Sequence, residues 1–232
     1  MKTALIAGAS GLVGSRLMYC LLKDSSYSKV IVLLRKELAI KDPKLVQVIV
    51  NYDELYKYKE QLIADDVFCC LGTTIGKAGS QKEFSKVDFT YPLALATLAA
   101  ENKSAQFFII TSLGADKNSS IFYSRTKGEV EAGIAALGIK KVFFIRPSLL
   151  LGTRKEFRLG EEIARGLSPL LSFFLLGTLK KYKPIHDIEV ARAMQVLASD
   201  YQEGAHIIES HVLKELGADK SGVKKSIYEK TR

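Results

Sequence analysis

The 232-residue chain contains no tryptophan, only three cysteines, three histidines and five prolines. Cys20, Cys69 and Cys70 form no C-x-x-C pair, and the histidines lack the spacing of metal ligands. These patterns argue against a disulfide framework and a zinc knuckle, and we expect no metal site. A chain without a disulfide pattern suits a reducing compartment, so we expect a cytoplasmic protein.

Long hydrophobic runs and clustered charge of one sign are also scarce. The apolar stretch at residues 170–177 is far shorter than the roughly 20 residues of a membrane span, and we expect no signal peptide. The net charge of +9 comes from scattered basic residues, unlike a nucleic-acid patch. We therefore expect a small-molecule substrate, no specific nucleic-acid partner and no membrane span. Residues 168–183 suit a substrate-pocket wall or a subunit contact better than a membrane-surface patch, and the oligomeric state stays open.

Short apolar runs alternate with helical patterns through the first 150 residues. The runs are apolar throughout, which is typical of strands covered on both faces. They are residues 3–8, 29–35, 45–50, 66–72, 106–112 and 141–147. Helical patterns lie between them, at 12–23, 53–63, 82–102 and around Tyr123. The alternation predicts an α/β fold, a Rossmann-type doubly wound parallel sheet.

The pattern changes after Pro147, where helical segments dominate. We expect helices near 157–167, 168–177 and 187–199, and one late strand at 204–210. The chain is therefore divided into a core, residues 1–150, and a small, mostly helical C-terminal lobe, residues 151–232. We expect this lobe to pack on the carboxyl edge of the sheet, on the substrate side of the same domain.

A glycine-rich loop, "GASGLVG" at residues 8–14, directly follows the first apolar run and opens the first helical pattern. Gly8 allows a tight turn, Gly11 lets the backbone approach a pyrophosphate, and Gly14 lets helix and strand pack closely. The helix N-terminus adds N–H donors and a positive dipole end for the phosphates. This context predicts that the core binds a dinucleotide. The expected contacts are Gly8, Ser10, Gly11, Leu12, Val13 and Gly14.

The residue that ends the second apolar run indicates which dinucleotide binds. NAD-preferring proteins place an acidic residue there for the ribose hydroxyls, whereas this chain has Arg35, followed by Lys36. A guanidinium can hold a 2′-phosphate through bidentate hydrogen bonds, and a carboxylate would repel it. The sequence therefore favours NADP, bound as NADPH, over NAD; a solvated basic turn is the alternative interpretation.

Tyr123 and Lys127 form a Y-x-x-x-K string, and Ser112 precedes the tyrosine at the end of the fifth apolar run. Together with the glycine loop, this set resembles the short-chain dehydrogenase/reductase superfamily. An atypical subgroup, the Tat-interacting-protein-like oxidoreductases and their bacterial relatives, is more similar still. The matching stretches are "GASGLVG", "CCLGTT", "TSLGADKNSSIFYSRTKGEVE" and "RPSLLLGTRKEFRLGE", in the same order from residue 8 to residue 161.

The resemblance implies hydride transfer between NADP(H) and a small carbonyl or alcohol substrate. Ser112 is expected to bind the substrate oxygen, Tyr123 to exchange a proton with it, and Lys127 to hold the nicotinamide ribose. The spacing alone places Tyr123 and Lys127 on one helix face, where an ammonium favours the phenolate. The resemblance places further cofactor contacts at Leu71, Gly72, Thr73 and Pro147.

Two other functions remain open at this point. A dinucleotide-sensing regulatory or scaffolding protein without turnover would need only the glycine loop. A nucleotide-sugar epimerase or dehydratase would use the same three residues, and it ranks lower because residues 151–232 are few for a nucleotide-sugar pocket. The superfamily often has a catalytic asparagine on its fourth helix; Asp88 lies near the start of that helical pattern, and we assign it no catalytic role.

Overall fold

The computed structural model describes residues 1–152, 183–199 and 202–218. A seven-stranded sheet runs through these residues in the order β3-β2-β1-β4-β5-β6-β9, with every neighbouring pair parallel. The prediction of a Rossmann-type α/β fold is confirmed. The order reverses direction between β1 and β4, and ligands of such sheets bind at the carboxyl ends of the strands beside this switch point.

The strands coincide closely with the apolar runs. They are β1 (Lys2–Ala7), β2 (Tyr27–Leu34), β3 (Leu45–Ile49), β4 (Asp66–Cys69), β5 (Gln106–Ile110), β6 (Lys141–Arg146) and β9 (Gly204–Glu209), with β7 (Leu150–Leu151) and β8 (Ile185–His186) forming a separate parallel pair. The late strand expected at 204–210 is confirmed as β9, which joins the main sheet beside β6.

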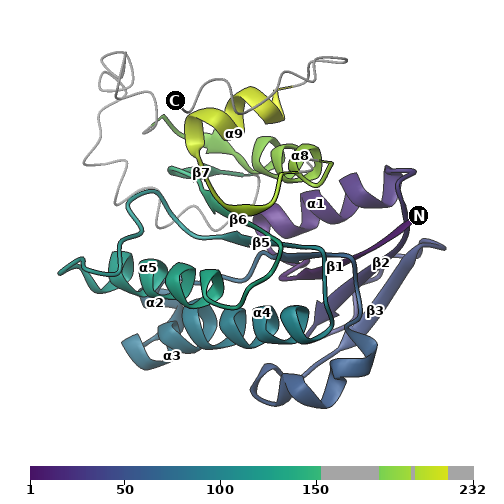
Figure 1. Ribbon diagram of the computed structural model, residues 1–232, viewed down its shortest axis with the longest axis horizontal. Helices are drawn as coiled ribbons and strands as arrows, with labels where there is room; N and C mark the ends of the chain where they lie inside the picture. Colours follow the sequence, from purple (N-terminus) through teal and green to yellow (C-terminus); the bar gives the residue numbers. More distant parts are fainter. Residues whose placement is uncertain (153–182, 200–201, 219–232) are drawn as a thin grey trace.

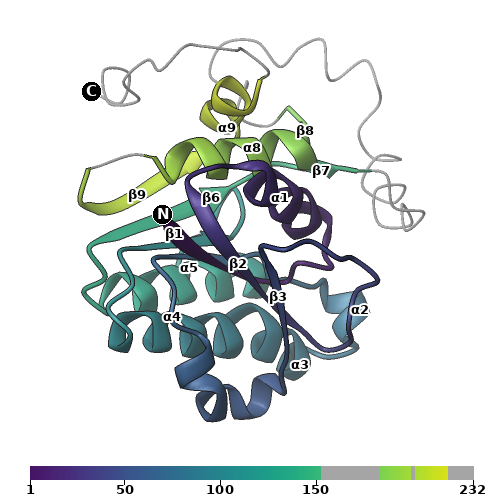
Figure 2. The same cartoon turned by 90° about the vertical axis from the view of Figure 1, so that its right-hand side faces the viewer.

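Helices cover both faces of the sheet (Figures 1 and 2). One face carries α1 (Leu12–Lys23), α8 (Asp187–Leu197) and α9 (Ser210–Gly217); the other carries α4 (Tyr91–Glu101) and α5 (Phe122–Ala135). Shorter elements lie near the second face: the 3-10 helix η1 (Tyr52–Gln61), α2 (Ile75–Ala78), α3 (Gln81–Ser85) and the π-helical turn η2 (Lys86–Thr90).

Each face has its own apolar core. Under α1 and α8, the neighbouring strands β4, β5 and β6 contribute a row of three buried phenylalanines, Phe68, Phe108 and Phe143. Their ring centroids are 4.7 Å and 4.5 Å apart along the row. The register pairs these residues directly across the strands, so the stacked rings fix the alignment of the strands whose ends lead to the site.

Two helical predictions differ from the structure in detail. The helix expected at 53–63 is a 3-10 helix, and the helix expected at 82–102 consists of α3, η2 and α4 in succession. Pro92 explains the second difference, because it has no N–H to donate to the carbonyl of Asp88 four residues earlier, and the chain forms a π turn there.

The helices expected near 157–167 and 168–177 lie outside the described residues, so the division at residue 150 stays a prediction. Among the described residues, no helix combines the length and the apolar character that crossing a membrane requires.

Candidate active site

The glycine loop is held by backbone contacts that leave no room for side chains. Gly8 follows β1 with φ +84°, and a Cβ there would lie 2.5 Å from the carbonyl oxygen of Cys70. A Cβ on Gly14 would lie 2.3 Å from the carbonyl oxygen of Gly8. The N–H of Gly11 donates to that same oxygen at 2.8 Å. The loop, the first turn of α1 and the residue after β4 therefore pack backbone against backbone at the switch point.

The N-terminus of α1 is open to an anion. Gly11 is the N-cap residue, no side chain caps the helix, and its first turn contains no acidic residue. The N–H groups of a first helical turn have no partner within the helix and carry the positive end of its dipole. A cradle of this kind suits a phosphate group.

Arg35 directly follows β2 and is exposed, next to a tyrosine that the sequence analysis did not select. The Tyr52 hydroxyl donates to the carbonyl oxygen of Leu33 at 3.3 Å. Burial raises the pKa of Tyr52 above its ordinary value, while the Gly8 N–H and the Arg35 guanidinium act in the opposite direction. Gly8 and Arg35 are therefore both close enough to Tyr52 to affect its pKa. In the sequence, Tyr52 is marked by its position just after the third apolar run and by nothing else.

Helix α5 carries Tyr123 in its first turn and Lys127 one turn later. The ring centroid of Tyr123 lies 5.5 Å from that of Phe84, which is fully buried on α3. Lys127 is only 4% exposed, and its Nζ lies 2.6 Å from Oδ1 of Asp88. The expected shared face of Tyr123 and Lys127 is thus formed on a helix, with a buried counter-ion that the sequence analysis did not foresee.

Asp88 connects Lys127 to the loop that follows β4. Its side chain is 1% exposed, and its Oδ2 accepts a hydrogen bond from the N–H of Thr73 at 2.9 Å. A Cβ on Gly72 would lie 3.6 Å from Oδ1 of Asp88. Gly72 and Thr73, two of the residues expected to contact the cofactor, therefore lie beside the Asp88–Lys127 pair. Asp88 lies in the middle of the π-helical turn η2, directly before α4.

Ser112 follows β5, and its Oγ is buried without a hydrogen-bond partner among the described residues. The loop after it folds back onto α5. The N–H of Asp116 donates to the carbonyl oxygen of Ser124 at 3.1 Å. A Cβ on Gly128 would lie 2.1 Å from the backbone nitrogen of Lys117, so only glycine allows this contact. Pro147, another expected contact residue, is buried after β6 and accepts from the N–H of Leu113 at 3.1 Å.

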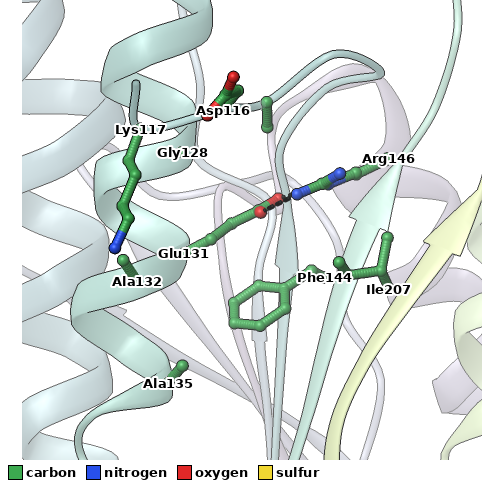
Figure 3. Close-up of a pocket in the computed structure, with 10 residues that line it drawn as sticks. Asp116, Lys117, Gly128, Glu131, Ala132, Ala135, Phe144, Arg146 and Ile207 are labelled. Atoms are coloured by element: carbon green, nitrogen blue, oxygen red, sulfur yellow. Dashed lines mark hydrogen bonds and ion pairs between the residues drawn. The ribbon is translucent and has the colours of Figure 1, made fainter. Parts of the chain in front are cut away.

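A second, partly buried ion pair links α5 to the sheet (Figure 3). The guanidinium of Arg146, at the end of β6, donates through Nε to Oε1 of Glu131 at 3.0 Å and through a second nitrogen to Oε2. The hydroxyl of Thr111 donates to the same Oε1 at 2.6 Å. A hollow of about 290 Å³ borders this pair between α5, β6 and β9, and its lining contains neither the glycine loop nor Ser112, Tyr123 or Lys127.

The parallel sheet, the glycine loop at its switch point and the helix with Tyr123 and Lys127 define a Rossmann-fold protein of the NAD(P)-binding type. No protein-family model matches the chain. The chain is 35% identical over 230 residues to protein HTATIP2 of Rattus norvegicus, covering 96% of this chain and 92% of the relative. Protein FMP52 of Debaryomyces hansenii is 31% identical over 205 residues, covering 85% and 88%. The chain therefore belongs to the HTATIP2-like family of atypical short-chain dehydrogenases/reductases, as the sequence motifs indicated.

Solved structures with the same fold include proteins in complex with NAD. MoeE5 in complex with UDP-glucose and NAD superposes with a TM-score of 0.65 at 16% identity, covering 95% of this chain and 82% of that one. The Bordetella bronchiseptica enzyme WbmH in complex with NAD+ gives 0.66 at 15% identity, covering 94% and 79%. At these identities the likeness concerns the fold alone.

The relatives correct one prediction. The expected cytoplasmic location is wrong by this comparison, because several fungal relatives, including those of Aspergillus niger and Candida albicans, are named as mitochondrial proteins. The inference failed because the absence of a disulfide pattern indicates reducing conditions and does not distinguish one reducing compartment from another.

Proposed function

We propose that this chain is an NADP(H)-dependent oxidoreductase that transfers a hydride to or from a small carbonyl or alcohol substrate. Ser112, Tyr123 and Lys127 are its site residues. The observation that carries the proposal is the buried Ser112 hydroxyl, which has no hydrogen-bond partner among the described residues. Such a group is uncommon in a folded protein, and a substrate oxygen supplies the missing partner.

The glycine loop fits a dinucleotide. The uncapped first turn of α1 offers backbone N–H groups to a pyrophosphate. Among the described residues, the atoms nearest a Cβ on Gly11 would be the carbonyl oxygens of Gly8 at 3.0 Å and Cys70 at 3.9 Å. A residue without a side chain at this position lets a pyrophosphate approach the backbone. Proteins with this fold, such as WbmH, were solved with NAD+, which supports a nicotinamide dinucleotide here.

NADP(H) is the favoured dinucleotide because of the charge after β2. Arg35 directly follows β2, is exposed and lies close enough to Tyr52 to affect its pKa. A guanidinium in this place binds a 2′-phosphate by charge-assisted hydrogen bonds. A carboxylate, the residue type expected for NAD, is absent from this position.

The site residues divide the work of carbonyl reduction. Ser112 donates a hydrogen bond to the substrate oxygen, and Tyr123 gives its hydroxyl proton to that oxygen as negative charge develops on it. Lys127 holds the ribose next to the reacting ring with the donors that Asp88 does not occupy. The bound nicotinamide supplies the hydride in reduction and accepts it in oxidation.

Replacing Tyr123 with phenylalanine tests this proposal. The variant keeps the ring that packs against Phe84 and loses the proton, so folding and NADPH affinity should survive. Turnover should fall by roughly 10²–10⁴-fold, the usual contribution of a positioned acid or base. The assay is NADPH oxidation with a panel of aldehydes, ketones and quinones. Tyr56→Phe is the matched control, because Tyr56 is 53% exposed and its hydroxyl donates to Glu101 at the surface.

Three results would contradict the proposal in different ways. Unchanged turnover in Tyr123→Phe would remove the proton-donor role. A chain that binds no dinucleotide would remove the cofactor assignment. NADPH binding without turnover on any member of the panel would favour the dinucleotide-sensing function.

A further inference from the structure

Asp88 and Lys127 form an ion pair that is nearly closed to solvent. Their side chains are 1% and 5% exposed, and the charged atoms lie 2.6 Å apart. Taking two charges out of water is costly unless they are paired and hydrogen-bonded. The remaining carboxylate oxygen accepts from the N–H of Thr73. The aspartate therefore gives the buried lysine a charged partner. An uncharged residue of similar shape, such as asparagine, would leave the lysine charge unpaired.

We propose that Asp88 is a positioning residue, the counter-ion that anchors Lys127 to the loop at residues 71–74 and offsets the lysine charge felt by Tyr123. The inference rests on the proposed function, because it explains how that site holds its lysine. Tyr123 lies one turn from Lys127 on α5, within reach of its charge. The carboxylate in contact with Lys127 partly neutralises the ammonium charge, whereas a lone ammonium would act on Tyr123 with its full charge.

Other charged groups near this pair do not replace Asp88. On α5 itself, Glu131 pairs with Arg146 of β6. On η2 and α4, Lys86 and Tyr91 both contact Asp53 at the surface. On β4, burial raises the pKa of the Cys69 thiol to about 12, so that thiol is neutral near pH 7. Asp88 is thus the acidic group in ion-pair contact with Lys127 in the described part of the chain.

The test is the substitution Asp88→Asn. Asparagine keeps an oxygen that accepts from the Thr73 N–H but removes the negative charge. Tyr123 ionisation is followed by phenolate absorbance, as the difference between each protein and the same protein carrying Tyr123→Phe. We expect Tyr123 to ionise at a pH lower by about one unit in Asp88→Asn. Asp53→Asn is the matched control and should leave the titration unchanged, because Asp53 pairs at the surface with Lys86.

A titration that stays in place, or moves to higher pH, overturns the proposal, since a purely structural Asp88 would change stability and not the charge at Tyr123. If Asp88→Asn does not fold, the double variant Asp88→Asn/Lys127→Met replaces it. That variant buries no unpaired charge, so it should be more stable than either single variant. A double variant less stable than both would also overturn the proposal. Neither measurement needs cofactor or turnover. The role of Asp88 can therefore be tested even if the proposed oxidoreductase function is wrong.

Discussion

The closest backbone contact in the glycine loop predicts how much a substitution at Gly14 lowers the free energy of unfolding. In Gly14→Ala the new methyl group would lie 2.3 Å from the carbonyl oxygen of Gly8 and 2.9 Å from its carbonyl carbon. Both partners are backbone atoms, so α1 must move away from β1 to relieve the overlap. Overpacking costs about 1–3 kcal/mol, and the rigid partners place this case near the upper end. Alanine recovers about 1 kcal/mol of helix propensity, which leaves a loss of about 2 kcal/mol.

Gly11→Ala is the matched comparison within the same loop. Its methyl group would lie 3.0 Å from the Gly8 oxygen, and the Gly11 φ of −78° suits any residue. The contact at 3.0 Å requires a shift of a few tenths of an ångström, and the weaker N-cap preference of alanine adds about 0.5–1 kcal/mol. Urea unfolding followed by circular dichroism measures both variants. The reasoning is refuted if Gly14→Ala is as stable as the wild type, or if Gly11→Ala is the more destabilised of the two.

Two further predictions concern the cofactor and the response to alkali. Arg35→Ala should weaken NADPH binding by about 10- to 100-fold because charge-assisted hydrogen bonds to the 2′-phosphate are lost. The affinity for NADH should stay unchanged. Equal affinities of the wild-type protein for the two cofactors, measured by titration, would contradict the assignment of NADP(H). Burial raises the pKa of the Cys69 thiol from 9.0 to about 12, so its contribution to stability is complete below pH 9 and is lost as the pH rises toward 12. The free energy of unfolding should fall over that range, and Cys69→Ala should reduce the fall; an identical pH profile in the variant would show that the thiol is not responsible.

The features that were predictable from the sequence are local. The central strands β1, β4, β5 and β6 fall on apolar runs because strands covered on both faces need apolar residues at most positions. The glycine loop was predictable because each of its three glycines has a local role in one short turn. In the structure the backbones of Gly8 and Gly14 pack against each other, as expected. The strand at 204–209 is mostly exposed, so burial on both faces does not account for its prediction, and its neighbour β6 lies far away in the sequence.

The features that escaped prediction depend on distant residues. Asp88 and Lys127 are 39 positions apart, and nothing in either segment indicates that they meet. The π turn that brings Asp88 inward did have a signal, because Pro92 cannot donate to the Asp88 carbonyl. The proline predicts an irregularity in the helix, but it does not predict that Asp88 pairs with Lys127. Tyr52 escaped for a related reason, since its contact with Leu33 forms only when β2 and η1 pack together.

The Asp88–Lys127 and Glu131–Arg146 ion pairs both hold helix α5. Tyr123, Lys127 and Glu131 follow one another at intervals of four residues, so they form a single stripe along the helix. Lys127 joins this stripe to η2 through Asp88, and Glu131 joins it to β5 and β6 through Thr111 and Arg146. Anchors to two different elements oppose both rotation and sliding of the helix. Because Thr111 immediately precedes Ser112, the second anchor also ties the strand end that carries the serine to the helix that carries the tyrosine. The two ion pairs therefore fix the position of Tyr123, the proposed proton donor, relative to Ser112, the proposed substrate-binding residue. The proposed reaction requires this because both hydroxyl groups must reach the same substrate oxygen atom.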